Sequence, residues 1–182
     1  MFKKFSEKDS VSQSSQLKSS VIRNLRHNFL QQYPHVEPYF DEIWPKRDNV
    51  KLVKCQDHIE LIASQTGDIL FFKQRDGTLL PTLRLVHKYP FILPWMQVDK
   101  GAIKFVLSGA NVMCPGMTSP GGKMSVVAKD TPVLLVAEGK DHALGIGMMK
   151  MSTEEVRKTN KGIGVDLIHF LNDGLWQMKS VK

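Results

Sequence analysis

The chain has 182 residues, of which 42% are hydrophobic and 24% are charged, and its formal net charge is +7 with a sequence pI near 9.4. This length allows one large domain or two small ones. Residues 1–92 hold 14 basic and 10 acidic side chains and residues 93–182 hold 11 and 8, so no basic tail carries the excess. The charge suits a polyanionic partner such as RNA, but an ordinary basic globular protein fits it equally well.

Cysteine content and hydropathy exclude several protein classes. Cys55 and Cys114 stand 59 positions apart, and two cysteines do not make a disulfide framework, so we expect a reducing compartment. No apolar run of signal-peptide length follows Met1–Phe5, and no stretch approaches the ~18 apolar residues of a membrane span. We therefore expect a soluble cytoplasmic protein with no membrane partner.

The first half predicts helices packed on a small antiparallel sheet. Residues 1–14 are expected to fray, or to be held only by Phe2 and Phe5. Apolar spacing over Ser15–Gln31 predicts an amphipathic helix, and Glu37–Trp44 predicts a second. The apolar stripe of the first helix consists of Leu17, Val21, Ile22, Leu25, Phe29 and Leu30. The strands and the last helical turn are expected at Val50–Cys55, His58–Ala63, Ile69–Phe72 and Leu83–Lys88.

The second half is dominated by short strands with glycine turns, which is typical of a small barrel or sandwich. The connector Tyr89–Pro94 should be extended, because it holds two prolines. Strands are expected at Thr131–Glu138, His142–Met151 and Gly164–Phe170. Ser152 and Glu155 form a capping box that starts a helix.

The stretch Val98–Met117 carries the strongest functional signal. Lys100–Leu107 predicts two helical turns with Ile103, Phe105, Val106 and Leu107 directed inward, ended by Gly109. A bare backbone at Gly109 and Ala110 beside lysines could lie against a sugar–phosphate backbone. A glycine that only turns the chain into the next strand explains the same residues.

Three motifs in this stretch, Asp99–Ala102, Val106–Ala110 and Val112–Gly116, resemble the opening of a PUA domain, a small barrel that binds structured RNA. Further segments, in order and spacing, resemble the malignant T-cell-amplified sequence family. They are Met1–Phe5, His58–Glu60, Pro81–Leu85, His87–Phe91 and Leu171–Trp176. The resemblance implies an α+β fold: an N-terminal α/β sandwich-like domain over residues 1–92, followed by a C-terminal PUA β-pseudobarrel over residues 93–182.

The resemblance also implies a function. Family members are non-catalytic translation factors that act with the density-regulated protein on the small ribosomal subunit, promoting reinitiation and release of deacylated tRNA. The PUA domain would face the acceptor end of the tRNA, whose A-form stem is recognised by shape. The expected RNA contacts are Lys100, Lys104, Ser108, Gly109, Ala110, Lys123 and Lys140. Two other readings stay open: an accessory module of an RNA-modifying enzyme, and a protein-interaction scaffold.

Basic residues of the first half are candidates for ribosome contact. Arg84, His87 and Lys88 share one face if they are helical, and Lys46 and Arg47 follow Pro45. An ordinary solvated face explains either group.

Enzymatic readings are weakly supported. Cys55 and His58 are three positions apart, but no residue that could orient them is identifiable, and a buried structural cysteine explains Cys55. The histidines show no metal-ligand spacing and there is no phosphate-binding glycine loop, so no metal or cofactor is expected. Ser119-Pro120 is a minimal proline-directed phosphorylation site.

Overall fold

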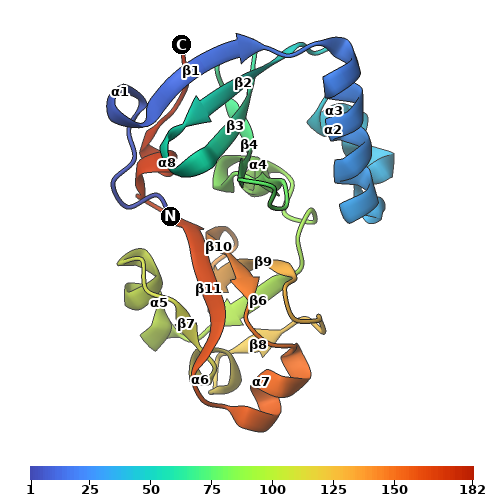
Figure 1. Ribbon diagram of the computed structural model, residues 1–182. Helices are drawn as coiled ribbons and strands as arrows, with labels where there is room; N and C mark the ends of the chain where they lie inside the picture. The colour runs from blue at the N-terminus through green and yellow to red at the C-terminus, as the bar shows by residue number, and fades with distance from the viewer. The chain divides into compact units, whose positions relative to one another are not determined.

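The computed structural model describes residues 1–182, and the chain divides into two compact units (Figure 1). The N-terminal unit consists of Phe5–Ile92 with Gln177–Lys182, and the C-terminal unit consists of Leu93–Trp176 with Met1–Lys4. Each terminal segment thus belongs to the unit formed by the other half of the chain. The domain ranges 1–92 and 93–182 stay a prediction.

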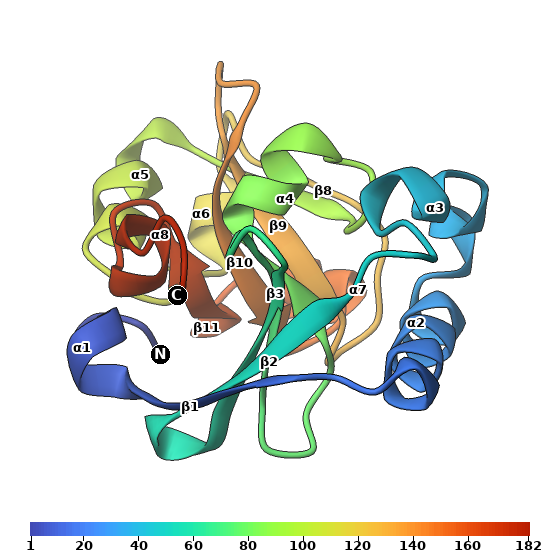
Figure 2. The ribbon, with the colours of Figure 1, turned by 90° about the horizontal axis from the view of Figure 1, so that it is seen from above.

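The N-terminal unit contains a five-stranded antiparallel sheet in the order β1-β2-β3-β4-β5. Figure 2 shows β1 along the outer edge of this sheet, beside β2. The strands are β1 (Val11–Gln16), β2 (Val50–Cys55), β3 (Ile59–Ser64), β4 (Ile69–Gln74) and β5 (Leu80–Pro81). The helices are α1 (Glu7–Ser10), α2 (Ser19–Gln32), α3 (Phe40–Ile43) and α4 (Leu83–Lys88), with 3-10 turns η1 (Pro34–Tyr39) and η2 (Gln56–His58).

An aromatic cluster joins these helices to the sheet. Phe29 of α2 stacks on Phe40 at 5.2 Å between ring centroids, and Trp44 lies 5.4 Å from Phe71 of β4. Arg26 is buried beside them, where its guanidinium lies 4.6 Å from the Phe40 ring centre and pairs with Asp41 at 2.6 Å. A buried arginine needs such partners, because an unpaired charge there would be costly.

Three details of the predicted first half are wrong. Val21 was assigned to the apolar stripe but is 41% exposed, while Arg26 takes a buried position of α2. The predicted helix Glu37–Trp44 is a 3-10 turn followed by the short α3, with Pro38 inside the turn. Residues 1–14 do not depend on Phe2 and Phe5 alone, because they form α1 and the start of β1.

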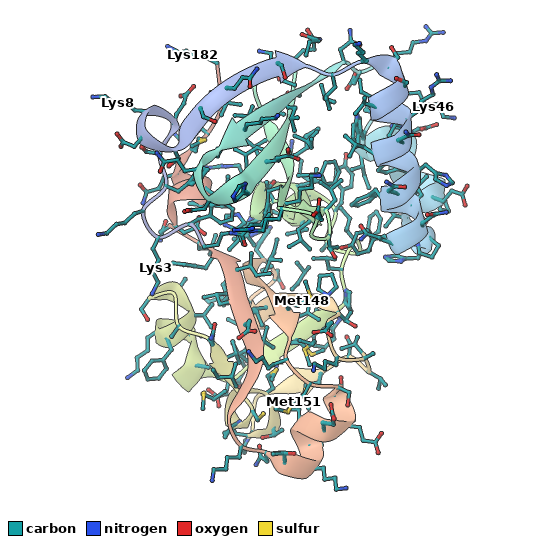
Figure 3. The ribbon with its side chains drawn as sticks, in the orientation of Figure 1. Lys3, Lys8, Lys46, Met148, Met151 and Lys182 are labelled. Atoms are coloured by element: carbon teal, nitrogen blue, oxygen red, sulfur yellow. The ribbon has the colours of Figure 1, made fainter.

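Lys8 and Lys46 extend outward from this unit (Figure 3).

The C-terminal unit contains a six-stranded mixed sheet in the order β7-β11-β10-β9-β6-β8, in which only β6 and β9 pair in parallel. The strands are β6 (Trp95–Val98), β7 (Val112–Met113), β8 (Lys123–Met124), β9 (Pro132–Ala137), β10 (Ala143–Met149) and β11 (Ile163–Phe170). The helices are α5 (Lys100–Leu107), α6 (Pro115–Thr118), α7 (Thr153–Thr159) and α8 (Gly174–Gln177).

The core of this unit draws on every long strand, with Met96, Val133, Leu135, Met149 and Val165 fully buried. The predicted capping box is confirmed: Ser152 accepts from the Glu155 N–H, and the Glu155 carboxylate accepts from the Ser152 N–H at 2.7 Å. These hydrogen bonds lower the pKa of Glu155. None of the helices combines the length and the apolar composition that a membrane-spanning helix requires.

Candidate RNA-binding site

Helix α5 is fixed at both ends by local hydrogen bonds. Asp99 caps its start, where carboxylate Oδ1 accepts from the Ala102 N–H at 2.8 Å. At its end the Gly109 N–H donates to the Val106 carbonyl and the Ala110 N–H donates to the Phe105 carbonyl, both at 2.9 Å. Gly109 has a φ of +83°, which completes a Schellman motif. The sequence reading of Gly109 as the end of the helix is therefore confirmed.

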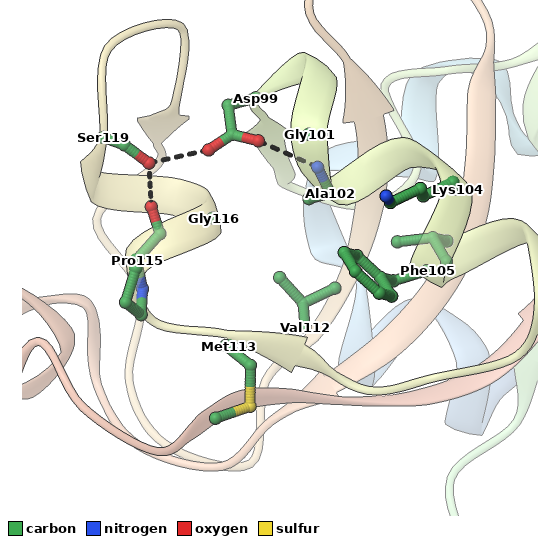
Figure 4. A pocket seen from close by; sticks show the side chains of 11 residues that line it. Asp99, Gly101, Ala102, Lys104, Phe105, Val112, Met113, Pro115, Gly116 and Ser119 are labelled. Carbon is green, nitrogen blue, oxygen red and sulfur yellow. Dashed lines mark hydrogen bonds between the residues drawn. The ribbon is translucent and has the colours of Figure 1, made fainter.

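Asp99 also joins α5 to α6. The Ser119 hydroxyl donates to Asp99 Oδ2 at 2.7 Å and lies close to the Pro115 carbonyl oxygen (Figure 4). The Asp99 N–H donates to the Gly116 carbonyl at 2.9 Å. The Asp99 carboxylate thus links the start of α5 to the residue that follows α6.

A pocket of about 430 Å³ lies between α5, β7 and α6 (Figure 4). Its wall is mostly apolar, with the Asp99 carboxylate, the Lys104 ammonium and the Ser119 hydroxyl as its charged and polar side chains. The lining residues are Asp99, Gly101, Ala102, Lys104, Phe105, Val106, Val112, Met113, Pro115, Gly116 and Ser119. An apolar pocket with a few polar groups is the usual form of a ligand site.

Two large side chains of the pocket stand in solvent. Phe105 is 54% exposed and Met113 is 50% exposed, although both are apolar. Lys104 Nζ lies 5.0 Å from the centre of the Phe105 ring. An exposed ring beside a cation is suited to a nucleobase, which stacks on aromatic faces while its phosphate meets the positive charge.

The expectation that Phe105 and Leu107 point inward is wrong. Leu107 is 40% exposed, and only Val106 of α5 is fully buried. Three consecutive helical residues point in directions about 100° apart, so they cannot all face one core. Sequence reasoning consequently missed Phe105, and it also missed Asp99 and Met113 as pocket residues. The helical period itself was the signal that could have identified Phe105.

The structure places the sequence-predicted contacts unevenly. Lys104 lines the pocket, and Lys100 and Ser108 are exposed on or beside the same helix. Gly109 and Ala110 are half-buried, and a Cβ on Gly109 would lie 2.3 Å from Lys3 Cε and 2.9 Å from Phe170 Cζ. The missing side chain of Gly109 therefore leaves room for protein atoms. Lys123 in β8 and Lys140 after Gly139 are exposed outside the pocket lining.

The basic candidates of the N-terminal unit lie on two elements. Arg84, His87 and Lys88 all belong to α4, which Thr82 caps; Arg84 and Lys88 are exposed and His87 is half-buried. Lys46 forms an ion pair with Asp41 at 3.0 Å, and Arg47 is exposed after it. The two groups remain predictions of ribosome contact.

Cys55 has the environment of a structural residue. Burial raises the pKa of its thiol to about 11, so the thiol stays protonated near neutral pH. The following turn η2 has positive φ at Asp57 and His58, which turns the chain between β2 and β3. No group of three or more His, Cys, Asp or Glu side chains is placed to hold a metal ion.

Comparison with known proteins divides the chain near its proline-containing connector. Residues 5–90 match the Pre-PUA-like domain and residues 94–171 match the PUA domain. The chain is 59% identical over 182 residues to human malignant T-cell-amplified sequence 2, covering 100% of both. The chain belongs to the malignant T-cell-amplified sequence family. The homologues of the family's protein 1 in Drosophila melanogaster and Dictyostelium discoideum are 57% and 50% identical, each covered over 100% of its length.

Solved structures confirm the fold of this family member. A hypothetical protein from the archaeon Pyrococcus horikoshii superposes with a TM-score of 0.73 at 22% identity, covering 92% of this chain and all 100% of that one. A conserved PUA domain protein from Thermoplasma acidophilum gives 0.67 at 19% identity, covering 92% and 99%. The predicted α+β fold with a C-terminal PUA pseudobarrel is confirmed. PUA membership supports RNA binding by the unit that contains the pocket.

Proposed function

We propose that this protein is a non-catalytic translation factor of the cytoplasm. It acts with the density-regulated protein on the small ribosomal subunit, promoting reinitiation and release of deacylated tRNA after termination. Its PUA domain holds the acceptor end of the tRNA. Full-length family identity supports the biological role, and the pocket beside α5 is the observation that supports the RNA contact.

The chemistry of the pocket suits a single-stranded tail. The Asp99 carboxylate and the apolar wall disfavour a phosphate inside, whereas bases can enter and stack on Phe105. Lys100 and Lys104 stand on the exposed surface of α5, where phosphates can reach them. Lys123 and Lys140 are proposed contacts to the more distant stem, and Arg84, Lys88, Lys46 and Arg47 to ribosomal RNA.

Charge reversal on α5 tests the RNA site. Lys100→Glu with Lys104→Glu should weaken binding of an acceptor-stem RNA with a 3′ tail by about tenfold or more, because two phosphate contacts become repulsive. The slope of log affinity against log salt should fall by about one unit or more. Fluorescence anisotropy of the labelled RNA measures both quantities.

The matched control is Arg157→Glu with Lys158→Glu, since both are exposed basic residues of α7 in the same unit but outside the pocket lining. It should keep nearly wild-type affinity. Equal affinity of the α5 variant and the wild type would contradict the proposed RNA site. An equal loss of affinity in the α5 variant and the control would also contradict it, because the loss would then come from the net charge and not from contacts at α5.

Pelleting of small ribosomal subunits tests the translation role. The protein should sediment with the subunits, and more completely when the density-regulated protein is present. Loss of RNA affinity without loss of pelleting would support the scaffold reading. Absence of pelleting under both conditions would contradict the proposed role on the ribosome.

A further inference from the structure

Strand β1 forms one edge of the N-terminal sheet. It is first in the strand order (Figure 2), and Ser12–Gln16 are exposed. Its sequence, Val-Ser-Gln-Ser-Ser-Gln, holds neither a charge nor a proline over six residues. At about 3.3 Å per residue, such a strand presents nearly 20 Å of backbone.

The other sheet edges of the chain are short. β5, β7 and β8 have two residues each, and β5 ends in Pro81. Proteins protect edges by shortening them or by adding charge, proline or a bulge, because an open edge pairs with other chains. β1 has one irregularity, between Val11 and Gln13, and pairs regularly with β2 from Gln13 to Gln16. Of the four strands that end the two sheets, β1 is the longest, and it has little protection.

The register shows which backbone groups of β1 face outward. The Leu17 N–H donates to the Val50 carbonyl at 3.1 Å, and Ser15 and Gln13 pair with Leu52 and Lys54 in the same register. Alternate residues of an antiparallel strand direct their N–H and C=O groups to opposite sides. The N–H and C=O groups of Ser14 and Gln16 therefore point away from β2, and an added strand can pair with them.

The net charge around this edge is positive. Lys51 and Lys54 of β2 stand opposite Gln16 and Gln13, and Lys8 and Lys18 lie just before and after β1 in the chain. Lys8, Lys18 and Lys54 are exposed, and Figure 3 shows Lys8 extending outward.

Carboxylates also lie near this edge, but they are fewer than the four lysines. Glu60 stands opposite Lys54 and pairs with Lys73 at 3.0 Å. Glu7 Oε1 accepts from the Lys182 N–H at 2.9 Å, and Asp9 Oδ2 accepts from the Ser6 hydroxyl at 2.8 Å. A second copy of this chain would bring like charges together at the edge. An acidic strand would meet opposite charge instead.

We propose that the β1 edge is a docking site for an acidic, extended segment of a partner protein, which adds to the sheet as a further strand. Main-chain hydrogen bonds to Ser14 and Gln16 provide the pairing, and the lysines provide the preference for acidic sequence. The site belongs to the N-terminal unit and uses none of the pocket residues, so it stands independently of RNA binding.

The test uses the full-length, isotope-labelled protein and two capped eight-residue peptides, one alternating Val with Glu and one alternating Val with Lys. The Val/Glu peptide should slow hydrogen exchange at the Ser14 and Gln16 amides and shift β1 signals. Its affinity should exceed that of the Val/Lys peptide at least tenfold at low salt. No protection of either amide by either peptide would overturn the proposal.

Ser14→Pro removes an outward N–H while leaving the β1–β2 hydrogen bonds in place, since edge strands tolerate proline on the open side. It should reduce peptide affinity at least tenfold, whereas Ser14→Ala keeps the N–H and should bind normally. Because proline could distort β1, Lys18→Glu with Lys54→Glu provides a second test: this variant should prefer the Val/Lys peptide.

Other occupants give different results. A dimer in sedimentation that protects the β1 amides without peptide would show that the edge pairs with itself. Stronger perturbation of the same amides by oligouridylate than by the Val/Glu peptide would show an RNA surface. Either outcome would overturn the acidic-strand assignment.

Discussion

Asp99 caps α5, accepts a hydrogen bond from Ser119 and lines the pocket. A change at a residue that contacts Asp99 should therefore alter the pocket. The Asp99 carboxylate accepts from the Ala102 N–H and from the Ser119 hydroxyl, at 2.8 and 2.7 Å. A negatively charged group in place of the Ser119 hydroxyl would remove the hydrogen bond to Asp99 and would stand beside the Asp99 carboxylate. Phosphorylation at the minimal Ser119-Pro120 site would therefore act on the same pocket that the RNA is proposed to enter.

Ser119→Glu should weaken binding of the acceptor-stem RNA several-fold at low salt, and the difference should shrink at high salt because the added charge is screened. Ser119→Ala removes the hydroxyl without adding charge and should stay within about twofold of wild type. Anisotropy titrations at two salt concentrations measure both variants. Equal affinity of Ser119→Glu and the wild type would count against regulation at this residue.

At the scale of elements, the sequence predicts features that depend on neighbouring residues, such as helix caps, but it does not predict features that depend on distant residues, such as the pairing of β1 with β2. The capping box of α7 and the glycine end of α5 lie within a few residues of their partners, so the sequence contains them completely. β1 was missed because its polar residues show no apolar alternation, and only pairing with β2 makes it a strand. The pocket was missed because the four-residue α6 has no helical period of its own.

The end of α5 gives a stability test with a built-in control. Gly109 and Gly162 both have positive φ, of +83° and +80°, but a Cβ would meet Phe170 at 2.9 Å in the first case and nothing within 4 Å in the second. Gly162→Ala should lower the free energy of unfolding by about 1 kcal/mol for the strained backbone. Gly109→Ala should cost about 1 to 2 kcal/mol more, because the buried Phe170 ring must shift.

Urea denaturation of the two variants measures this difference. Equal losses would mean that the Phe170 contact does not constrain Gly109. Retained RNA affinity in a folded Gly109→Ala variant would assign Gly109 to the structure of α5 and remove it from the proposed RNA contacts.

At the scale of the whole molecule, the chain passes between its two units three times, after Lys4, after Ile92 and after Trp176. Phe2 is fully buried and belongs to the C-terminal unit, where its carbonyl accepts from the Gly174 N–H at 2.8 Å. Met178 and Val181 are buried in the N-terminal unit, and the Val181 N–H donates to the Gly67 carbonyl at 3.0 Å. Stability of each unit should therefore depend on the distant end of the sequence.

Two changes, one at each end of the chain, test whether each terminal segment stabilises the unit formed by the other half of the sequence. Deleting Gln177–Lys182 removes two buried apolar side chains, so it should lower the stability of the N-terminal unit by about 3 kcal/mol or more. Phe2→Ala should lower the stability of the C-terminal unit by about 3 to 5 kcal/mol. Native-state hydrogen exchange at the amides of Leu61 in β3 and Met149 in β10 reports the two units separately; the Met149 N–H donates to the Thr131 carbonyl at 3.0 Å. Faster hydrogen exchange at Met149 after the C-terminal deletion, with Leu61 unchanged, would contradict the assignment of the terminal segments, because the loss of stability would then follow proximity in sequence and not packing.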